Sequence, residues 1–126
     1  MSYVVASQFA ITLRKGRVAM SYASLFEDAY EIVSQIPEGY VMTYSQIAAI
    51  LGNPRYARRI GQAMYGAPPD RNLPCHRVVH ADGGLCVGTE FGQIQHELLL
   101  AEGVSFLPGK KVAKVDLILH QWMTYR

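Results

Sequence analysis

Apolar residues recur along this chain at helical spacing, and capping residues and breakers divide them into short elements. The first pattern predicts a helix that begins at Ser24, because Ser24 and Glu27 have the spacing of a capping box. Pro37 ends this helix. Its apolar positions are Leu25, Ala29, Ile32, Val33 and Ile36, and acids cluster on its outer side at Glu27, Asp28, Glu31 and Glu38.

A second helix is predicted over residues 44–51, after a short extended segment at residues 40–42. Thr43 and Gln46 have the spacing of a further capping box at its start. Gly52 closes this helix, since glycine is the residue that most readily ends one.

A third helix is predicted over about residues 55–65, after a tight turn at Asn53-Pro54. Two short helices joined by a tight turn, the second of them basic, have the outline of a helix-turn-helix, although any helical hairpin shares it. The third helix also carries small residues that would let it approach a surface closely, namely Ala57, Gly61 and Ala63.

The second half of the chain is predicted to alternate short strands with one more helix. Residues 77–79 and 85–87 flank the turn residues Asp82-Gly83-Gly84, a hairpin signature. A helix over about residues 92–101 follows, and further short strands are expected at residues 104–106 and 115–119.

The length of 126 residues, half of them apolar, fits one domain. We expect residues 22–126 to form that domain, after an extension of uncertain structure at residues 1–21. The predicted class is α/β, mostly α: a single winged helix-turn-helix-like DNA-binding domain with short C-terminal strands. No apolar run reaches the length of a membrane span, and the N-terminus lacks the order of a signal peptide.

The net charge of +2 is small, but the basic residues are unevenly distributed. One segment holds five arginines against the single acid Asp70: Arg55, Arg58, Arg59, Arg71 and Arg77. Such a segment indicates a substrate carried on a phosphate backbone; the alternative is a solvated arginine face.

The stretch Pro74-Cys75-His76-Arg77 places a thiol beside an imidazole and a guanidinium. A cysteine attacks as thiolate, and we expect the neighbouring His or cation to lower the thiol pKa. Adjacent residues of an extended strand point to opposite faces, so the pair requires a bend, which Pro74 favours. The alternative is an incidental Cys-His dipeptide.

The two cysteines, Cys75 and Cys86, cannot form a disulfide framework, and a reducing cytoplasm fits best. With His76 and His80 they match no common zinc spacing, so no metal site is expected. We interpret Cys86 as a small apolar strand residue rather than a second acceptor.

Five segments stand in a distinctive order along the chain: Tyr44-Ser45-Gln46-Ile47-Ala48, Gly52-Asn53-Pro54, residues 58–64, residues 74–79, and Leu98-Leu99 with Glu102-Gly103. In order and spacing they resemble the DNA-binding domain of the O6-alkylguanine-DNA alkyltransferases, over roughly Phe26 to Val104. That family binds the minor groove of double-stranded DNA, flips O6-alkylguanine into a pocket and moves the alkyl group irreversibly onto its own cysteine. No cofactor is implied, since the protein is the acceptor.

The resemblance implies a role for each matching residue. Cys75 would be the acceptor, and His76 its water-linked base. Arg58 would fill the hole left in the base stack, and Tyr44 would crowd the target's phosphate and promote its rotation. Further DNA contacts are predicted at Arg55, Arg59, Gln62 and Arg77, and pocket walls at Met64, Val78, Gly88 and Thr89.

Three departures from the family pattern resemble the alkyltransferase-like proteins, which sense lesions without repairing them. Ala67 stands where the family has Asn, and residues 88–91 replace its Tyr-Ser-Gly-Gly pocket wall. The Glu that completes the family's Cys-His-water-Glu relay is not placed by the sequence: the aligned position is His96, with Glu97 beside it. The intact Cys75 instead favours a single-turnover repair enzyme, and both readings stay open.

For the sensor alternative, the partners would include downstream repair proteins. A third reading is a winged-helix-like DNA binder in which Cys75 is merely packed. We expect a monomer, in the cytoplasm of a bacterium, associated with the nucleoid, or in the nucleus of a eukaryote.

Overall fold

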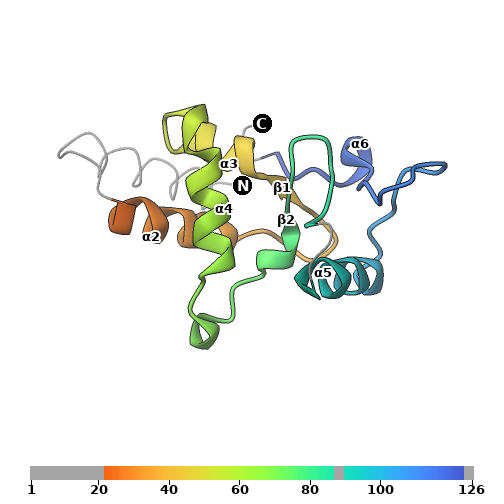
Figure 1. Ribbon diagram of the computed structural model, residues 1–126, viewed down its shortest axis with the longest axis horizontal. Helices are drawn as coiled ribbons and strands as arrows, with labels where there is room; N and C mark the ends of the chain where they lie inside the picture. Colours follow the sequence, from red (N-terminus) through yellow and green to blue (C-terminus); the bar gives the residue numbers. More distant parts are fainter. Residues whose placement is uncertain (1–21, 87–89, 124–126) are drawn as a thin grey trace.

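The computed structural model describes residues 22–86 and 90–123 (Figure 1). The predicted extension at residues 1–21 lies outside them. The helices are α2 (Tyr22–Val33), α3 (Tyr44–Ile50), α4 (Ala57–Tyr65), α5 (Glu90–Ala101) and α6 (Leu117–His120). Short 3-10 turns lie at η1 (Pro54–Tyr56), η2 (Pro69–Arg71) and η3 (Cys75–Arg77), and the strands are β1 (Met42–Thr43) and β2 (Val78–Val79). The mostly helical class with short strands is confirmed.

The two strands separate the interior into two hydrophobic clusters. β1 and β2 pair in parallel, with Met42 opposite Val78 and Thr43 opposite Val79. Neighbouring residues of a strand point to opposite faces, so Val78 packs against α2, α3 and α4 while Val79 packs in the second cluster with Leu99 of α5. Figure 1 shows α2 and α4 on one side of the strands and α5 and α6 on the other.

Local capping explains why α3 and the turn into α4 form where the sequence predicts them. The Thr43 side chain accepts from the Gln46 amide, and the Gln46 side chain accepts from the Thr43 amide, which confirms the capping box. Gly52 then adopts a φ of +104°, which glycine tolerates best, and Asn53 caps the next turn through the Arg55 amide. The Tyr30 hydroxyl ties α2 to α4 by donating to the Ala63 carbonyl at 2.9 Å.

The predicted ends of the first helix are wrong, and one predicted strand is absent where the structure describes it. α2 already contains Ser24 and ends at Val33, so Ser24 cannot serve as its N-cap and the chain leaves the helix before Pro37. The predicted strand at residues 85–87 is absent over Leu85 and Cys86, and Val87 lies outside the described residues. The Gly84 backbone pairs with Lys114 instead of continuing a hairpin, although the Gly83 turn is present.

The C-terminal segment also differs from the prediction of strands. Residues 117–120 form the short helix α6, and extended pairing is limited to single bridges such as Phe106 with Val115. The chain then lies along Val41, whose amide donates to the His120 carbonyl and whose carbonyl accepts from the Trp122 amide. Alternating apolar residues fit either structure when a segment is this short. Within the described residues, every helix is too short or too polar to cross a membrane.

Candidate functional site

The segment from Pro69 to Val79 holds Cys75 in a bent backbone just before β2. Asn72 takes a left-handed φ of 52°, and the Cys75 amide then donates to the Leu73 carbonyl at 2.8 Å. Cys75 therefore begins a 3-10 turn, as the bend predicted at Pro74 requires. Because β2 follows at once and is paired with β1, the position of the thiol is fixed by the sheet.

Cys75 lies on the wall of a cavity of about 600 Å³. The cavity is mostly apolar and is enclosed by α3, α4, the loop before Cys75 and the start of α5. Its lining comprises Tyr44, Gly61, Met64, Tyr65, Ala67, Pro68, Pro69, Asn72, Leu73, Cys75, Cys86 and Phe91. This volume falls in the range that encloses a small organic ligand.

A second cavity, of about 470 Å³, shares three wall residues with the first: Tyr44, Gly61 and Cys86. It reaches Arg58 of α4 and His80, whose ring lies against Tyr44 with centroids 5.3 Å apart. The two cavities are therefore adjacent, and we call the three residues that line both of them the neck; Cys75 lines only the first cavity and Arg58 only the second.

The imidazole of His76 points to Glu102 rather than to the thiol. His76 Nε2 lies 2.7 Å from Glu102 Oε2, and Arg77 Nη2 lies 2.8 Å from the same oxygen. The sequence left the carboxylate that would partner His76 unassigned, with His96 at the aligned position and Glu97 beside it. In the structure the carboxylate that contacts His76 is that of Glu102, the residue that follows α5. The His96 ring instead packs on Phe106, with centroids 4.6 Å apart.

Glu102 is held in its ionised form by these contacts. Burial alone would raise its pKa, but hydrogen bonds from Arg77, His76 and the Gly39 amide lower the pKa of Glu102 to about 2. A neutral His76 that donates through Nε2 to this carboxylate keeps Nδ1 as an acceptor.

The pKa of Cys75 is not lowered, contrary to the expectation from its neighbours in sequence. Burial raises the pKa of the thiol, and a backbone hydrogen bond offsets this only in part. The reason is geometric: among the described residues, His76 and Arg77 direct their polar atoms at Glu102 and not at the sulfur.

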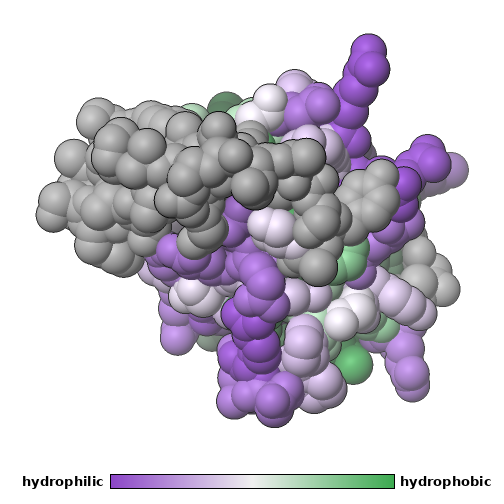
Figure 2. All heavy atoms as spheres, turned by 90° about the vertical axis from the view of Figure 1, so that its left-hand side faces the viewer, coloured by the Kyte–Doolittle hydropathy of each residue, from purple (hydrophilic) through white to green (hydrophobic). Residues whose placement is uncertain are grey.

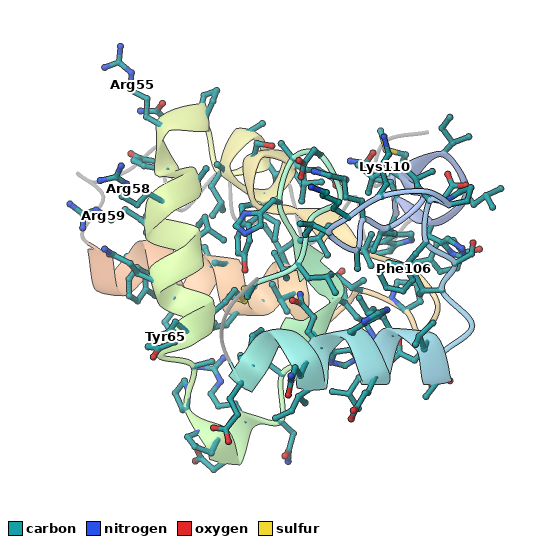
Figure 3. All side chains as sticks on the ribbon, turned by 45° about the vertical axis from the view of Figure 1, so that its right-hand side comes forward. Arg55, Arg58, Arg59, Tyr65, Phe106 and Lys110 are labelled. Carbon is teal, nitrogen blue, oxygen red and sulfur yellow. The ribbon has the colours of Figure 1, made fainter. Side chains whose placement is uncertain are left out.

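The five arginines of the basic segment separate in space. Arg55 of η1 and Arg58 and Arg59 of α4 project away from the rest of the protein (Figure 3). Arg71 instead pairs with Glu27 on α2 at 2.9 Å. Arg77, predicted as a DNA contact, is largely buried, with 16% of its side chain exposed, and binds Glu102 and the Ile36 carbonyl. Seen from the side on which α2 lies, the visible described surface is mostly hydrophilic (Figure 2).

The remaining predicted site residues fall into three groups. Tyr44 and Met64 line the cavity, as expected. Val78 does not: its side chain is fully buried in the first hydrophobic cluster. Gln62 lies on the exposed side of α4 and accepts from Arg59 at 3.1 Å, and Gly88 and Thr89 lie outside the described residues.

Gln95 of α5 is a buried polar residue that sequence reasoning missed. Its amide donates to the carbonyls of His76, at 3.2 Å, and Val78, at 2.9 Å, and it accepts from the Cys86 amide at 3.0 Å. It thus joins the nucleophile turn to the segment that carries Cys86. A glutamine among the apolar positions of α5 was the only available signal, and its partners are distant in sequence.

A family comparison identifies a domain over most of the described chain. The model of the DNA-binding domain of 6-O-methylguanine DNA methyltransferase matches residues 24–104. This range contains α2 from Ser24 onward, all of α3 to α5, and all lining residues of both cavities.

Individual relatives fall into two functional groups. The DNA base-flipping protein of Escherichia coli is 40% identical over 93 residues, which cover 74% of this chain and 70% of that protein. The methylated-DNA–protein-cysteine methyltransferase of Rattus norvegicus is 34% identical over 95 residues, 75% of this chain but only 44% of that enzyme. The chain thus spans less than half of that methyltransferase.

A solved structure agrees with the fold. The alkyltransferase-like protein of Schizosaccharomyces pombe, in complex with damaged DNA containing O6-carboxymethylguanine, superimposes with a TM-score of 0.73 at 33% identity. The match covers 82% of this chain and 99% of that protein.

Proposed function

We propose that this chain, which belongs to the family defined by the DNA-binding domain of 6-O-methylguanine DNA methyltransferase, repairs O6-alkylguanine in DNA by accepting the alkyl group on Cys75. One observation carries the proposal: the cavity lined by Cys75 adjoins a second cavity lined by Arg58 of α4, and the two share the three residues of the neck. A base stacked in a duplex cannot reach such a sulfur, so the target must be extruded into the cavity.

Binding would use α4 as the helix presented to the duplex. Arg55, Arg58 and Arg59 supply phosphate contacts, and Arg58, at the edge of the second cavity, stands where an extruded base leaves the stack. Extrusion costs a few kcal/mol, which inserted side chains and phosphate contacts offset. Tyr44, at the neck, would border the path of the extruded nucleotide.

The chemical step is a displacement at the alkyl carbon. The Cys75 sulfur attacks that carbon, the bond from the carbon to guanine O6 breaks, and a thioether forms on the protein. His76 accepts the thiol proton through Nδ1, by way of a water molecule, while Glu102 holds the opposite nitrogen. The proton finally resides on the released guanine. Because the thioether is stable, each molecule acts once.

The test is the mass of the intact protein after incubation with a duplex that carries one O6-methylguanine. We expect the addition of one methyl group, located on the peptide that contains Cys75 and not on the peptide that contains Cys86. The same duplex with unmodified guanine should add nothing, and Cys75→Ala should bind the damaged duplex without gaining mass.

A second function is favoured by two observations at the same cavity. Burial raises the pKa of Cys75, so a reactive thiolate is disfavoured in the DNA-free protein, and Ala67 stands in the cavity wall where methyltransferases of the family carry Asn. On this alternative the protein binds O6-alkylguanine and leaves its repair to another pathway. Protein that stays unmodified while saturated with damaged DNA would reject alkyl transfer and support the sensor.

The size of the cavity bears on the range of adducts. At about 600 Å³ it has room for a purine with a sizeable substituent, and its walls are mostly apolar. We therefore expect O6-benzylguanine to be bound at least as tightly as O6-methylguanine. Binding of both duplexes, measured side by side, tests this, and a strict preference for the methyl adduct would contradict it.

A further inference from the structure

The second cysteine is part of the site, although its sequence context suggested an inert strand residue. Cys86 lines the cavity that contains Cys75 and also the second cavity, so it stands at the neck between them. Both cysteines are partly exposed, and neither is in a disulfide. The structure thus places two thiols on the wall of a single cavity.

The segments that carry the two sulfurs are fastened to each other through one side chain. Gln95 accepts from the Cys86 amide at 3.0 Å and donates to the His76 carbonyl at 3.2 Å, one residue after Cys75. Because Gln95 is fully buried, this connection is protected from solvent. The two cysteine backbones are therefore held on the same side of α5.

The Tyr44 hydroxyl interacts with the side chains of both cysteines. Its hydroxyl lies 3.8 Å from Cys86 Sγ. Burial is the main cause that raises the pKa of Tyr44, and the closeness of Cys86 and then of Cys75 raises it further. The two sulfurs accordingly lie within electrostatic reach of one oxygen atom.

We propose that Cys75 and Cys86 are a redox-active dithiol pair, which a small disulfide such as glutathione disulfide converts into an intramolecular disulfide. One protein thiolate attacks the glutathione disulfide and forms a mixed disulfide, releasing one glutathione thiolate. The second protein thiolate then displaces the other glutathione. Two electrons pass from the protein sulfurs to glutathione disulfide, and the two thiol protons end on the two glutathione thiols.

This inference extends the proposed function but is separable from it. The disulfide would remove the Cys75 nucleophile, so alkyl transfer would stop until the bond is reduced. That consequence rests on the proposed function; formation of the disulfide does not. A disulfide requires Cα atoms within about 7 Å, so its formation reports directly on how close the cysteines come.

The experiment treats the full chain with glutathione disulfide at mildly alkaline pH and measures intact mass under non-reducing conditions. We expect the loss of two hydrogen atoms, a peptide that links Cys75 to Cys86, and full reversal by dithiothreitol. Cys86→Ser should stop at one glutathione attached to Cys75, because no second thiol can displace it. Separate glutathione adducts on both cysteines of the parent, or a dimer linked between chains, would overturn the proposal.

A second measurement separates this inference from alkyl transfer. Reduced, oxidised and re-reduced protein are each offered the O6-methylguanine duplex. We expect the reduced protein to be methylated, the oxidised protein to stay unmethylated, and the re-reduced protein to be methylated again. If the oxidised protein accepts the methyl group as fast as the reduced protein does, the dithiol pair is refuted; if the reduced protein accepts none while the disulfide still forms, only the proposed function fails.

Discussion

Glu102 connects the turn that carries Cys75 to the C-terminal end of α5 and to Gly39. Its carboxylate accepts from His76, Arg77 and the Gly39 amide, and only 12% of its side chain is exposed. Three donors on one buried carboxylate make the ionised form strongly preferred. The charge of Glu102 therefore contributes to stability as well as to the orientation of His76.

The pH dependence of stability should reveal this carboxylate. The folded-state pKa of Glu102 is about 2, below its ordinary value of 4.5. A lowered pKa gives stability that is present above about pH 4.5 and is lost as the pH falls toward 2. We expect the free energy of unfolding of Glu102→Gln to be lower than that of the parent near neutrality, and this difference to shrink across that window. Urea unfolding at a series of pH values measures it; a constant difference down to pH 2 would contradict the assignment.

The reactivity of Cys75 should follow its burial. Because burial raises the thiol pKa, the thiolate fraction at neutral pH is smaller than that of an ordinary cysteine. The rate of Cys75 alkylation by iodoacetamide should therefore reach half of its plateau above pH 9, the ordinary value for this group. Peptide mass spectrometry follows the label, with a short unstructured peptide containing one cysteine as the control. A midpoint pH below that of the peptide would contradict the raised pKa and support the expectation that His76 lowers the thiol pKa.

Caps and turns that depend on neighbouring residues were predicted correctly, whereas the helix boundary that depends on the rest of the fold was not. The Thr43–Gln46 capping box and the Gly52 turn need only neighbouring residues, and the structure contains both. Ser24 has the same local pattern as Thr43, yet α2 begins before it, since packing of the helix outweighs a single cap. A capping pattern therefore indicates a helix more reliably than it fixes the first residue.

The candidate site shows more clearly that sequence patterns do not reveal contacts between distant residues. Sequence spacing located the Cys75 turn. The residues that bind His76 and Arg77 come from α5 and the residue after it, and only the fold brings them close. Glu102 lies 26 residues beyond His76, and Gln95 lies 19 residues beyond it. Arg77 was predicted as a DNA contact, as part of the basic segment and of the family resemblance, whereas in the structure it is largely buried and pairs with Glu102. No pattern in the sequence shows whether an arginine at this position contacts DNA or forms a buried ion pair.

Helix α4 offers a substitution that separates stability from DNA binding. An added methyl group at Gly61 meets no atom within 4 Å, and Gly61 lines both cavities. Gly61→Ala should raise helix stability by up to about 1 kcal/mol. The same methyl group narrows the neck, so binding of O6-methylguanine duplex should weaken while binding of undamaged duplex changes less. Thermal unfolding and fluorescence anisotropy measure the two effects, and equal weakening for both duplexes would place Gly61 against the DNA surface rather than at the neck.

Over the whole molecule, charge is distributed so that one side can face a polyanion. The chain carries a net charge of only +2, but Arg55 of η1 and Arg58 and Arg59 of α4 project on one side of the protein. Arg71 and Arg77 lie elsewhere, on Glu27 and Glu102. Binding to DNA should therefore depend on salt through a few phosphate contacts on this side. The arginines differ in one respect that allows their roles to be separated: Arg58 borders the second cavity, and Arg55 does not.

Two alanine variants use that difference. Arg55→Ala should weaken binding to damaged and undamaged duplexes about equally and reduce the slope of log affinity against log salt by about 1. Arg58→Ala should reduce the slope similarly and also remove most of the preference for the O6-methylguanine duplex, because the cation that would occupy the vacated position in the stack is gone. Dissociation constants for both duplexes across a salt series, with parent protein as reference, measure slope and preference together. If Arg58→Ala kept the parent's lesion preference, Arg58 would be a phosphate contact like Arg55, and extrusion would have to depend on Tyr44 and the neck alone.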